Sequence, residues 1–257
     1  MLTNKLRKEI RALHRRKGRE NQKKCLIEGE RSVVSALVAG ADIRLLVHSK
    51  SFHSPAIAEM VRGAGIKMHE VDDVEMQYLS DVSTPPGVLA VSVTPLTRPE
   101  NLDKLNSVLV LDAIKDPGNA GTLIRTASWF GVEGILALPG TVDLSAPKVV
   151  RASMGGIWDV KLACTDFPDD WLNGWRKSGG EVIAADLAGQ YFDSWTPSGK
   201  TALVVGSEAD GLSTSVRTFV DSYVQIPGCK KGSSSESLNA AVAGGILIAW
   251  WQRNSKV

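Results

Sequence analysis

The sequence predicts an α/β fold in which a mostly parallel sheet carries helices on both faces, with a smaller α/β unit preceding it. Beyond residue 105, short apolar runs alternate with helical segments. Runs of Val, Ile and Leu without polar alternation are typical of parallel strands that are covered on both faces. Residues 1–93 show a second, separate alternation of helices and strands. The predicted strands of the larger unit are 108–111, 134–138, 182–185, 202–205 and 223–226.

The smaller unit is predicted from capping residues and apolar spacing. A helix that opens near Glu30 carries apolar residues at helical intervals and ends at Gly40, a residue suited to the left-handed position after a helix. Asp72 or Asp73 is placed to cap a short helix that runs to Leu79. The remaining predicted elements are a strand at 43–47, a helix at 55–62 and a strand at 88–93.

A Pro-punctuated polar stretch at residues 94–101 separates the two patterns. Such stretches are typical of domain boundaries. We therefore expect an N-terminal domain at 1–94, a linker at 95–104 and a larger domain at 105–257.

The charge is unevenly distributed. The whole chain of 257 residues has a net charge of +2, yet the first 24 residues carry ten Lys or Arg side chains and two Glu side chains. A basic arm ahead of a nearly neutral body indicates a polyanionic partner. Leu6, Ile10 and Leu13 give this arm the spacing of an amphipathic helix, which favours a folded segment over a cleaved targeting peptide.

Several classes of protein are disfavoured by composition. Three widely spaced cysteines, without a CxxC pair or clustered histidines, predict no disulfide framework and no metal site, and favour a reducing, cytoplasmic compartment. The longest apolar run, 238–251, is shorter than the roughly 20 residues that span a bilayer, so we expect no membrane segment.

Two common nucleotide-binding motifs are also absent. Gly199 and Lys200 resemble the end of a P-loop, but Ser194 occupies the position where the motif needs glycine. No GxGxxG sequence follows any predicted strand, so the usual dinucleotide fingerprint is missing. A sheet of this kind must therefore bind its ligand in another way.

Polar residues follow the predicted strand 108–111. Asp116, Pro117 and Gly118 predict a turn, and Asn119 is well placed to cap a helix that continues through residue 129. Arg125 lies nearly two turns along this helix. From spacing alone, Asn119 could be only a helix cap and Arg125 only a solvated charge, or the two could form a functional pair.

Two further segments carry unusual polar residues. Gly206 and Glu208 follow the strand 202–205, at the end of a strand where ligands of open α/β sheets bind. Ile226 precedes a polar loop, and Ser237 and Asn239 then open a helix that is otherwise apolar. Polar groups that begin an apolar helix need partners when buried, although helix capping would also explain them.

In this order, the three segments resemble the three motifs of the SpoU/TrmH family of RNA 2′-O-ribose methyltransferases, over roughly residues 107–251. The resemblance implies transfer of a methyl group from S-adenosylmethionine without a metal, a C-terminal trefoil knot, and a homodimer formed through the C-terminal domain. It implies catalytic roles for Asn119, Arg125, Glu208, Ser237 and Asn239. The cofactor contacts that it implies are Leu187, Gly206, Ile226, Ser237 and Leu238.

In that family, the arginine at the position of Arg125 lies beside the methyl acceptor. A guanidinium stays charged, so it is a poor general base. We expect it to clamp a neighbouring phosphate through two hydrogen bonds, align the ribose hydroxyl and stabilise its developing negative charge.

The N-terminal unit resembles the small RNA-binding domain that precedes the catalytic domain in many family members. The predicted RNA contacts are Arg15, Arg16, Lys17 and Arg19, with a solvated basic helix as the alternative. Arg151 lies in a segment, 147–156, that resembles an element common in the subgroup with rRNA substrates. It is expected to face either substrate or a dimer partner.

Two features near the C-terminus need separate comment: a loop that departs from the family pattern, and an apolar helix that has two explanations. The loop after Ile226 is longer than usual and adds Lys230 and Lys231, which are placed to be solvated or to reach phosphate, while Ser233 and Glu236 form a possible capping box. The helix 237–251 is apolar on every face, so we expect it to be buried in the core or against a second subunit.

The preferred function is that of an RNA 2′-O-ribose methyltransferase that uses S-adenosylmethionine, with rRNA favoured over tRNA as substrate. A catalytically silent RNA-binding protein on the same scaffold remains an alternative, and an unrelated nucleotide-dependent α/β enzyme is a second one.

Overall fold

The structure is a computed structural model that describes residues 2–228 and 237–255. The chain forms two compact units, and each is described by itself. The first comprises Met1–Pro95 together with Asp143–Asp159, and the second comprises Leu96–Val142 and Val160–Val257. The segment at 143–159 thus joins the first unit although it lies within the larger predicted domain. The domain division at 94 and 105 itself stays a prediction.

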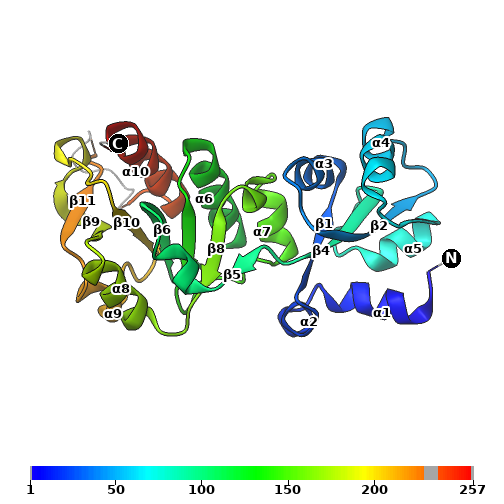
Figure 1. Ribbon diagram of the computed structural model, residues 1–257, viewed down its shortest axis with the longest axis horizontal. Helices are drawn as coiled ribbons and strands as arrows, with labels where there is room; N and C mark the ends of the chain where they lie inside the picture. The colour runs from blue at the N-terminus through cyan, green and yellow to red at the C-terminus, as the bar shows by residue number, and fades with distance from the viewer. Residues whose placement is uncertain (1, 229–236, 256–257) are drawn as a thin grey trace. The chain divides into compact units, whose positions relative to one another are not determined.

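The first unit contains a four-stranded sheet in the order β1-β4-β2-β3 (Figure 1). The strand β4 runs antiparallel to both β1 and β2, whereas β2 and β3 are parallel. The strands are β1 (Lys24–Glu28), β2 (Ile43–Ser49), β3 (Met68–Val71) and β4 (Val88–Val93). The helices are α1 (Asn4–Ala12), α2 (Arg16–Gln22), α3 (Glu30–Val38), α4 (Pro55–Ala64), α5 (Asp73–Leu79) and α7 (Pro147–Ala152).

Local signals in the sequence explain these helices. The Asp72 side chain accepts a hydrogen bond from the backbone of Glu75 and begins α5, as predicted. Gly40 follows α3 with a φ of +72°, which confirms the predicted helix end. The amphipathic spacing of α1 buries Ile10, and Leu13 just beyond the helix is buried with it.

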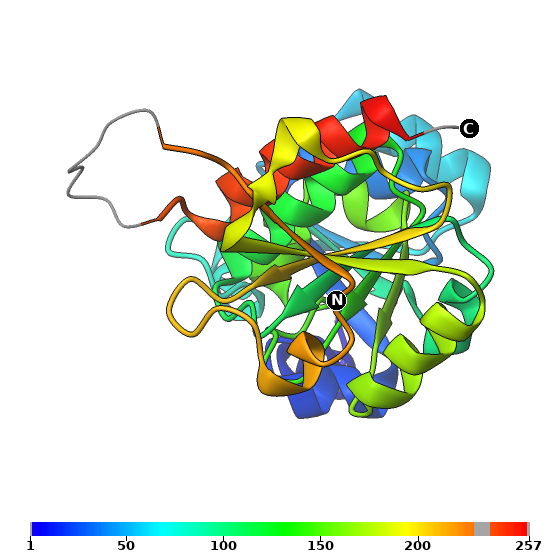
Figure 2. The same ribbon diagram turned by 90° about the vertical axis from the view of Figure 1, so that its left-hand side faces the viewer.

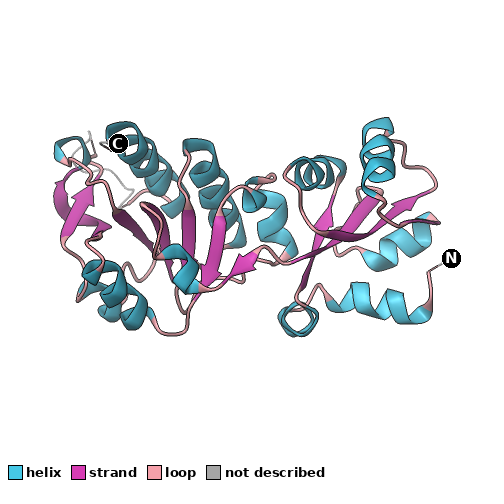
Figure 3. Ribbon diagram, viewed as in Figure 1, coloured by secondary structure: helices cyan, strands magenta, loops and turns pink. Residues whose placement is uncertain are grey.

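The second unit contains seven parallel strands in the order β11-β9-β10-β6-β7-β8-β5. Strands are magenta in Figure 3, and most of these are labelled in Figure 1. All five strands predicted for this unit are confirmed, although β9 continues well beyond its predicted end. Two short strands are additional, and β5 lies within the predicted linker. The strands are β5 (Leu96–Thr97), β6 (Ser107–Asp112), β7 (Gly134–Ala137), β8 (Lys161–Cys164), β9 (Glu181–Tyr191), β10 (Thr201–Gly206) and β11 (Ser222–Gln225).

Helices cover both faces of this sheet (Figures 1 and 2). The helices α6 (Pro117–Phe130) and α10 (Ala240–Asn254) pack together on one face, and α8 (Pro168–Lys177) and α9 (Thr214–Arg217) lie on the other. On the α8 side, Trp171 and Trp175 stack with ring centroids 5.1 Å apart and pack against the sheet. None of the described helices combines the length and apolarity needed to cross a membrane.

The strand register places the functional segments at one edge of this sheet. Gly206 at the end of β10 pairs with Asp112 at the end of β6, and Val204 of β10 pairs with Ala184 of β9. Because parallel strands end at the same edge, the chain leaving β6, β9, β10 and β11 emerges there. The predicted trefoil knot stays a prediction.

Close packing of α10 against α6 predicts different effects for two neighbouring glycines. A Cβ atom on Gly244 would overlap Leu123 Cδ2, whereas one on Gly245 would lie 3.8 Å from Thr126 Cγ2. Both alanine substitutions gain the same helix propensity. We expect Gly244→Ala to be less stable than Gly245→Ala by about 1–3 kcal/mol in denaturant unfolding. Equal stabilities would contradict this account of the packing.

Candidate functional site

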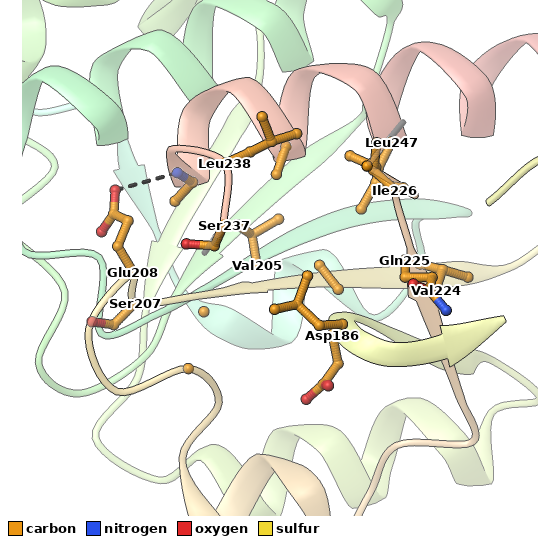
Figure 4. A pocket seen from close by; sticks show the side chains of 17 residues that line it. Asp186, Val205, Ser207, Glu208, Val224, Gln225, Ile226, Ser237, Leu238 and Leu247 are labelled. Carbon is orange, nitrogen blue, oxygen red and sulfur yellow. Dashed lines mark hydrogen bonds between the residues drawn. The ribbon is translucent and has the colours of Figure 1, made fainter. Parts of the chain in front are cut away.

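A cavity of about 590 Å³ opens at the carboxyl edge of the seven-stranded sheet (Figure 4). Four segments that are distant in sequence form its walls. They are residues 185–187 of β9, residues 205–208 with Gly211 at the end of β10, residues 224–226 with Gly228 at β11, and the chain that leads into α10 together with the first turns of that helix. The last segment contributes Ser237, Leu238, Ala240, Ala243 and Leu247.

All five predicted cofactor residues line this cavity: Leu187, Gly206, Ile226, Ser237 and Leu238. Leu187 and Leu238 have exposed fractions of 63% and 46%, which are high for leucine side chains. Large apolar side chains exposed around a cavity are characteristic of ligand-binding sites. The geometry therefore brings the predicted residues together, while their individual roles stay predictions.

Gly206 is required by the backbone that follows it. A Cβ atom at this position would lie 2.6 Å from the carbonyl oxygen of Gly211, because the turn closes back on the strand end. Two backbone hydrogen bonds of 3.1 and 2.9 Å join Ser207 and Gly211 and fix that turn. The glycine thus shapes the loop that forms the cavity wall.

Glu208 links three predicted catalytic segments. Its carboxylate Oε1 accepts hydrogen bonds from the side-chain amides of Asn119 and Asn239, the latter at 3.5 Å. The backbone N–H of Ala240 donates to the same oxygen at 3.3 Å, as the dashed line in Figure 4 marks. Asn239 also donates to Asn119 Oδ1 at 3.1 Å. Three residues separated by up to 120 positions therefore form one polar cluster.

The prediction that Asn119 caps α6 is wrong. Asp116 is the N-cap, and its carboxylate accepts a hydrogen bond of 2.8 Å from the backbone N–H of Asn119. Pro117 then occupies the first helical position, where its missing N–H costs nothing. Since Asp116 performs the capping, the Asn119 amide is left to bond Glu208.

The Asn239 side chain both caps α10 and bonds to the polar cluster, the two roles that its position in the sequence allowed. Its Oδ1 accepts from the backbone N–H groups of Ala241 and Val242, at 3.0 and 3.3 Å, and so caps α10. Its Nδ2 simultaneously donates to the Glu208 cluster. Ser237 lies on the cavity wall, ahead of the helix (Figure 4).

Arg125 lies apart from this cluster within a single chain. It is exposed on α6 and does not line the cavity. Among residues 2–228 and 237–255, its guanidinium forms no hydrogen bond or ion pair. The structure therefore joins Asn119, Glu208 and Asn239, but it does not join Arg125 to them.

Arg19 was predicted to contact RNA, but the structure buries it. It has an exposed fraction of only 4%, and its Nε donates to Asp143 at 2.8 Å while Nη1 donates to the Leu13 carbonyl at 2.8 Å. Burial favours the neutral form of Asp143, but hydrogen bonds from Ser145 and Arg19 outweigh it and hold the pKa of Asp143 below its ordinary value. Arg19 thus serves the core of the first unit instead of offering charge to a phosphate.

The other predicted RNA contacts differ in their surroundings. Arg15, Arg16 and Lys17 are exposed, and Arg16 pairs with Glu20 at 2.7 Å. Arg151 forms an ion pair with the fully buried carboxylate of Glu28, which also accepts from the Ser80 hydroxyl. The structure therefore assigns Arg151 an internal partner.

Several lining residues were not predicted from sequence. Gln225 and Leu247 belong to this group, although Gln225 precedes the predicted Ile226 and Leu247 follows Ala240 by about two helical turns. That helical spacing was the signal that could have identified Leu247. Lys230, Lys231 and the capping box of Ser233 and Glu236 lie outside the described residues. Over the part of the chain that is described, no three potential metal ligands gather.

Comparison with known proteins gives the family. Residues 106–249 match the SpoU rRNA Methylase family, and residues 4–90 match the MRM3-like substrate binding domain. The 23S rRNA (guanosine(2553)-2′-O)-methyltransferase RlmP of Bacillus subtilis is 29% identical over 94% of this chain and 93% of its own length.

Two solved structures share the fold over nearly the whole chain. The AdoMet-bound rRNA methyltransferase of Sinorhizobium meliloti is 29% identical with a TM-score of 0.82, covering 98% of this chain and 96% of that one. The SpoU methyltransferase AviRb of Streptomyces viridochromogenes, in complex with AdoMet, is 26% identical with a TM-score of 0.84, covering 98% of each chain. The motifs, the fold and the family match agree, and the chain belongs to the SpoU rRNA Methylase family.

Proposed function

We propose that this protein transfers a methyl group from S-adenosylmethionine to a ribose 2′-hydroxyl of ribosomal RNA. The observation that carries the proposal is the meeting of the segments around Gly206, Ile226 and Ser237 at one cavity. RNA as the substrate class follows from relatives named as rRNA 2′-O-methyltransferases. Those names favour rRNA over the tRNA alternative. A catalytically silent protein is disfavoured because the five predicted catalytic residues are all present: Asn119, Arg125, Glu208, Ser237 and Asn239.

The cavity suits an adenosyl sulfonium compound. Its volume lies within the range of about 300–1,000 Å³ that is usual for small-molecule sites. Val205, Ile226 and Leu247 offer apolar walls for a flat base. Among the described lining residues, Asp186 and Glu208 are the charged ones, and Glu208 places a negative charge that favours a ligand with a positive sulfur.

The polar cluster acts by fixing the shape of the site. When bound, S-adenosylmethionine supplies an electrophilic methyl group and a thioether leaving group. Glu208 Oε1 is held by three donors, so we assign it a positioning role that ties Asn119 and the start of α10 to the turn after β10. Gly206, Ile226, Ser237 and Leu238 would hold this cofactor, which would supply the methyl group to the 2′-oxygen of the RNA.

We also propose that the catalytic form is a homodimer built on α6 and α10. Val242 and Ile246 of α10 remain 51% and 36% exposed in the single chain, and Trp129 of α6 is 83% exposed. Arg125 lies one helical turn before Trp129 on the same side of α6, so this interface would bring a second chain to Arg125. A cytoplasmic location stays a prediction.

Sedimentation tests the dimer. We expect the wild-type protein to sediment at about twice the chain mass of 27.6 kDa, and Trp129→Glu to shift it towards the monomer because a charge replaces an apolar contact. Phe167→Glu is the matched control, since Phe167 is 70% exposed at the start of α8 on the opposite face. Equal effects of both variants, or a monomeric wild type, would refute the proposed interface.

The activity is tested by incubating the protein with S-adenosylmethionine and unmodified 23S rRNA or tRNA transcripts. Methylated positions are then mapped by their resistance to alkaline cleavage. We expect a 2′-O-methyl group in the rRNA only. Modification of tRNA alone would select the alternative substrate, and an absence of S-adenosylmethionine binding in calorimetry would favour the silent RNA-binding protein.

Arg125 is tested by a substitution that keeps the charge. If the guanidinium clamps a phosphate through two hydrogen bonds, Arg125→Lys should lower kcat/KM for methyl transfer at least about tenfold, close to the loss in Arg125→Ala. Calorimetric binding of S-adenosylmethionine should stay unchanged, because Arg125 does not line the cavity. Turnover of Arg125→Lys like that of the wild type would rule out the clamp.

A further inference from the structure

An exposed ion pair forms a second link between two loops at the functional edge of the sheet. Lys115 Nζ lies 2.9 Å from Asp210 Oδ2, and both side chains are 67% exposed. Lys115 precedes Asn119 by four residues, and Asp210 follows Glu208 by two. Since Asn119 and Glu208 are themselves hydrogen-bonded, the pair lies next to the polar cluster.

The backbone around Lys115 is fixed on both sides. Ala113 adopts a left-handed φ of +55° directly after β6, a conformation that non-glycine residues adopt only when their surroundings enforce it. Ile114 is then fully buried, and Asp116 caps α6. The amino group of Lys115 is therefore carried on an anchored loop and remains open to solvent.

Charge explains why a cation is needed at this edge. Among the described residues that line the cavity, the charged ones are Asp186 and Glu208, and these carboxylates repel the phosphates of an approaching RNA. Arg217 compensates Asp186 at 3.2 Å and also donates to the Leu212 carbonyl at 3.3 Å, so it is committed to the cavity wall. Lys115 has an exposed partner outside the cavity lining and can exchange it.

We propose that Lys115 binds an RNA phosphate next to the target ribose, and that Asp210 holds the lysine in place until the phosphate displaces it. This inference rests on the proposed function and names one contact of the substrate. An ion pair exposed on both sides is weak, whereas a phosphate offers a stronger charge-assisted bond. Consistent with a close contact, the hydrogen bond and charge of Lys115 lower the pKa of Asp210.

A purely structural link between the loops makes a different prediction from a phosphate contact. If the pair only staples the two loops, removing either partner damages the site in the same way. If Lys115 binds phosphate, removing the lysine weakens RNA binding, whereas removing Asp210 frees the lysine and strengthens it. The two single variants therefore separate the explanations by the sign of their effects.

The experiment compares Lys115→Ala, Asp210→Ala and Lys177→Ala with the wild-type protein. Lys177 is an exposed lysine at the end of α8, ahead of β9, so it lies towards the opposite edge of the sheet and serves as the matched control. Methyl transfer to unmodified 23S rRNA transcripts is measured at saturating S-adenosylmethionine. Binding of the same RNA is followed by fluorescence anisotropy between low and moderate salt.

We expect Lys115→Ala to raise the KM for RNA about tenfold and to reduce the slope of log affinity against log salt by about 0.7–0.9, the loss of one phosphate contact. Asp210→Ala should lower the KM, and Lys177→Ala should change neither quantity. Calorimetric binding of S-adenosylmethionine should be the same in all four proteins.

An unchanged salt slope in Lys115→Ala, or higher KM values in both Lys115→Ala and Asp210→Ala, would overturn the inference. Failure of the proposed function looks different, because the wild-type protein itself would then methylate no RNA. The anisotropy measurement still decides the role of Lys115 in that case, since it needs no methyl transfer.

Discussion

The site depends on one carboxylate that serves three hydrogen-bond donors. Glu208 draws the Asn119 amide, the Asn239 amide and the first N–H group of α10 to a single oxygen. A negative charge at this position also suits the positive end of the α10 dipole. Because the donors come from segments that follow different strands, the carboxylate fixes how α6, α10 and the turn after β10 surround the cavity. Without it, the amides would need other acceptors, and the cavity wall would lose its shape.

The arrangement of strands could be predicted because it depends on local pattern. Buried parallel strands appear as continuous apolar runs, and their shared carboxyl edge follows from parallel pairing. Two short strands were not predicted because they lack a continuous apolar run. The strand β5 has two residues, and β8 buries only the middle two of its four. Their place is set by pairing with longer neighbours, which a local pattern does not contain. The same limit applies to Arg19, whose partner Asp143 lies 124 positions away.

Within the site, helix capping can be predicted from the local sequence, whereas the hydrogen-bonded cluster of side chains cannot. Asp116 directly before Pro117 is a local signal for a helix start, so the role of Asp116 was available from sequence. The family resemblance assigned Asn119 and Glu208 to one site, but the bond between them was not predicted, because spacing does not reveal partners 89 residues apart. Gly206 shows a third case. It lines the cavity, and the tight turn that ends at Gly211 requires a glycine there, while its contact with the cofactor stays a prediction.

The basic N-terminal arm illustrates why net charge overstates the surface offered to RNA. Arg7, Arg11 and Arg19 pair with Glu75, Asp81 and Asp143, so much of the positive charge is neutralised within the first unit. The exposed cations that remain for solvent include Lys5, Lys8, Arg15 and Lys17. Phosphate contacts of this kind supply affinity without sequence information. Choosing one ribose therefore requires cations that the fold anchors beside the reacting atoms, and a charge count along the chain cannot distinguish the two kinds.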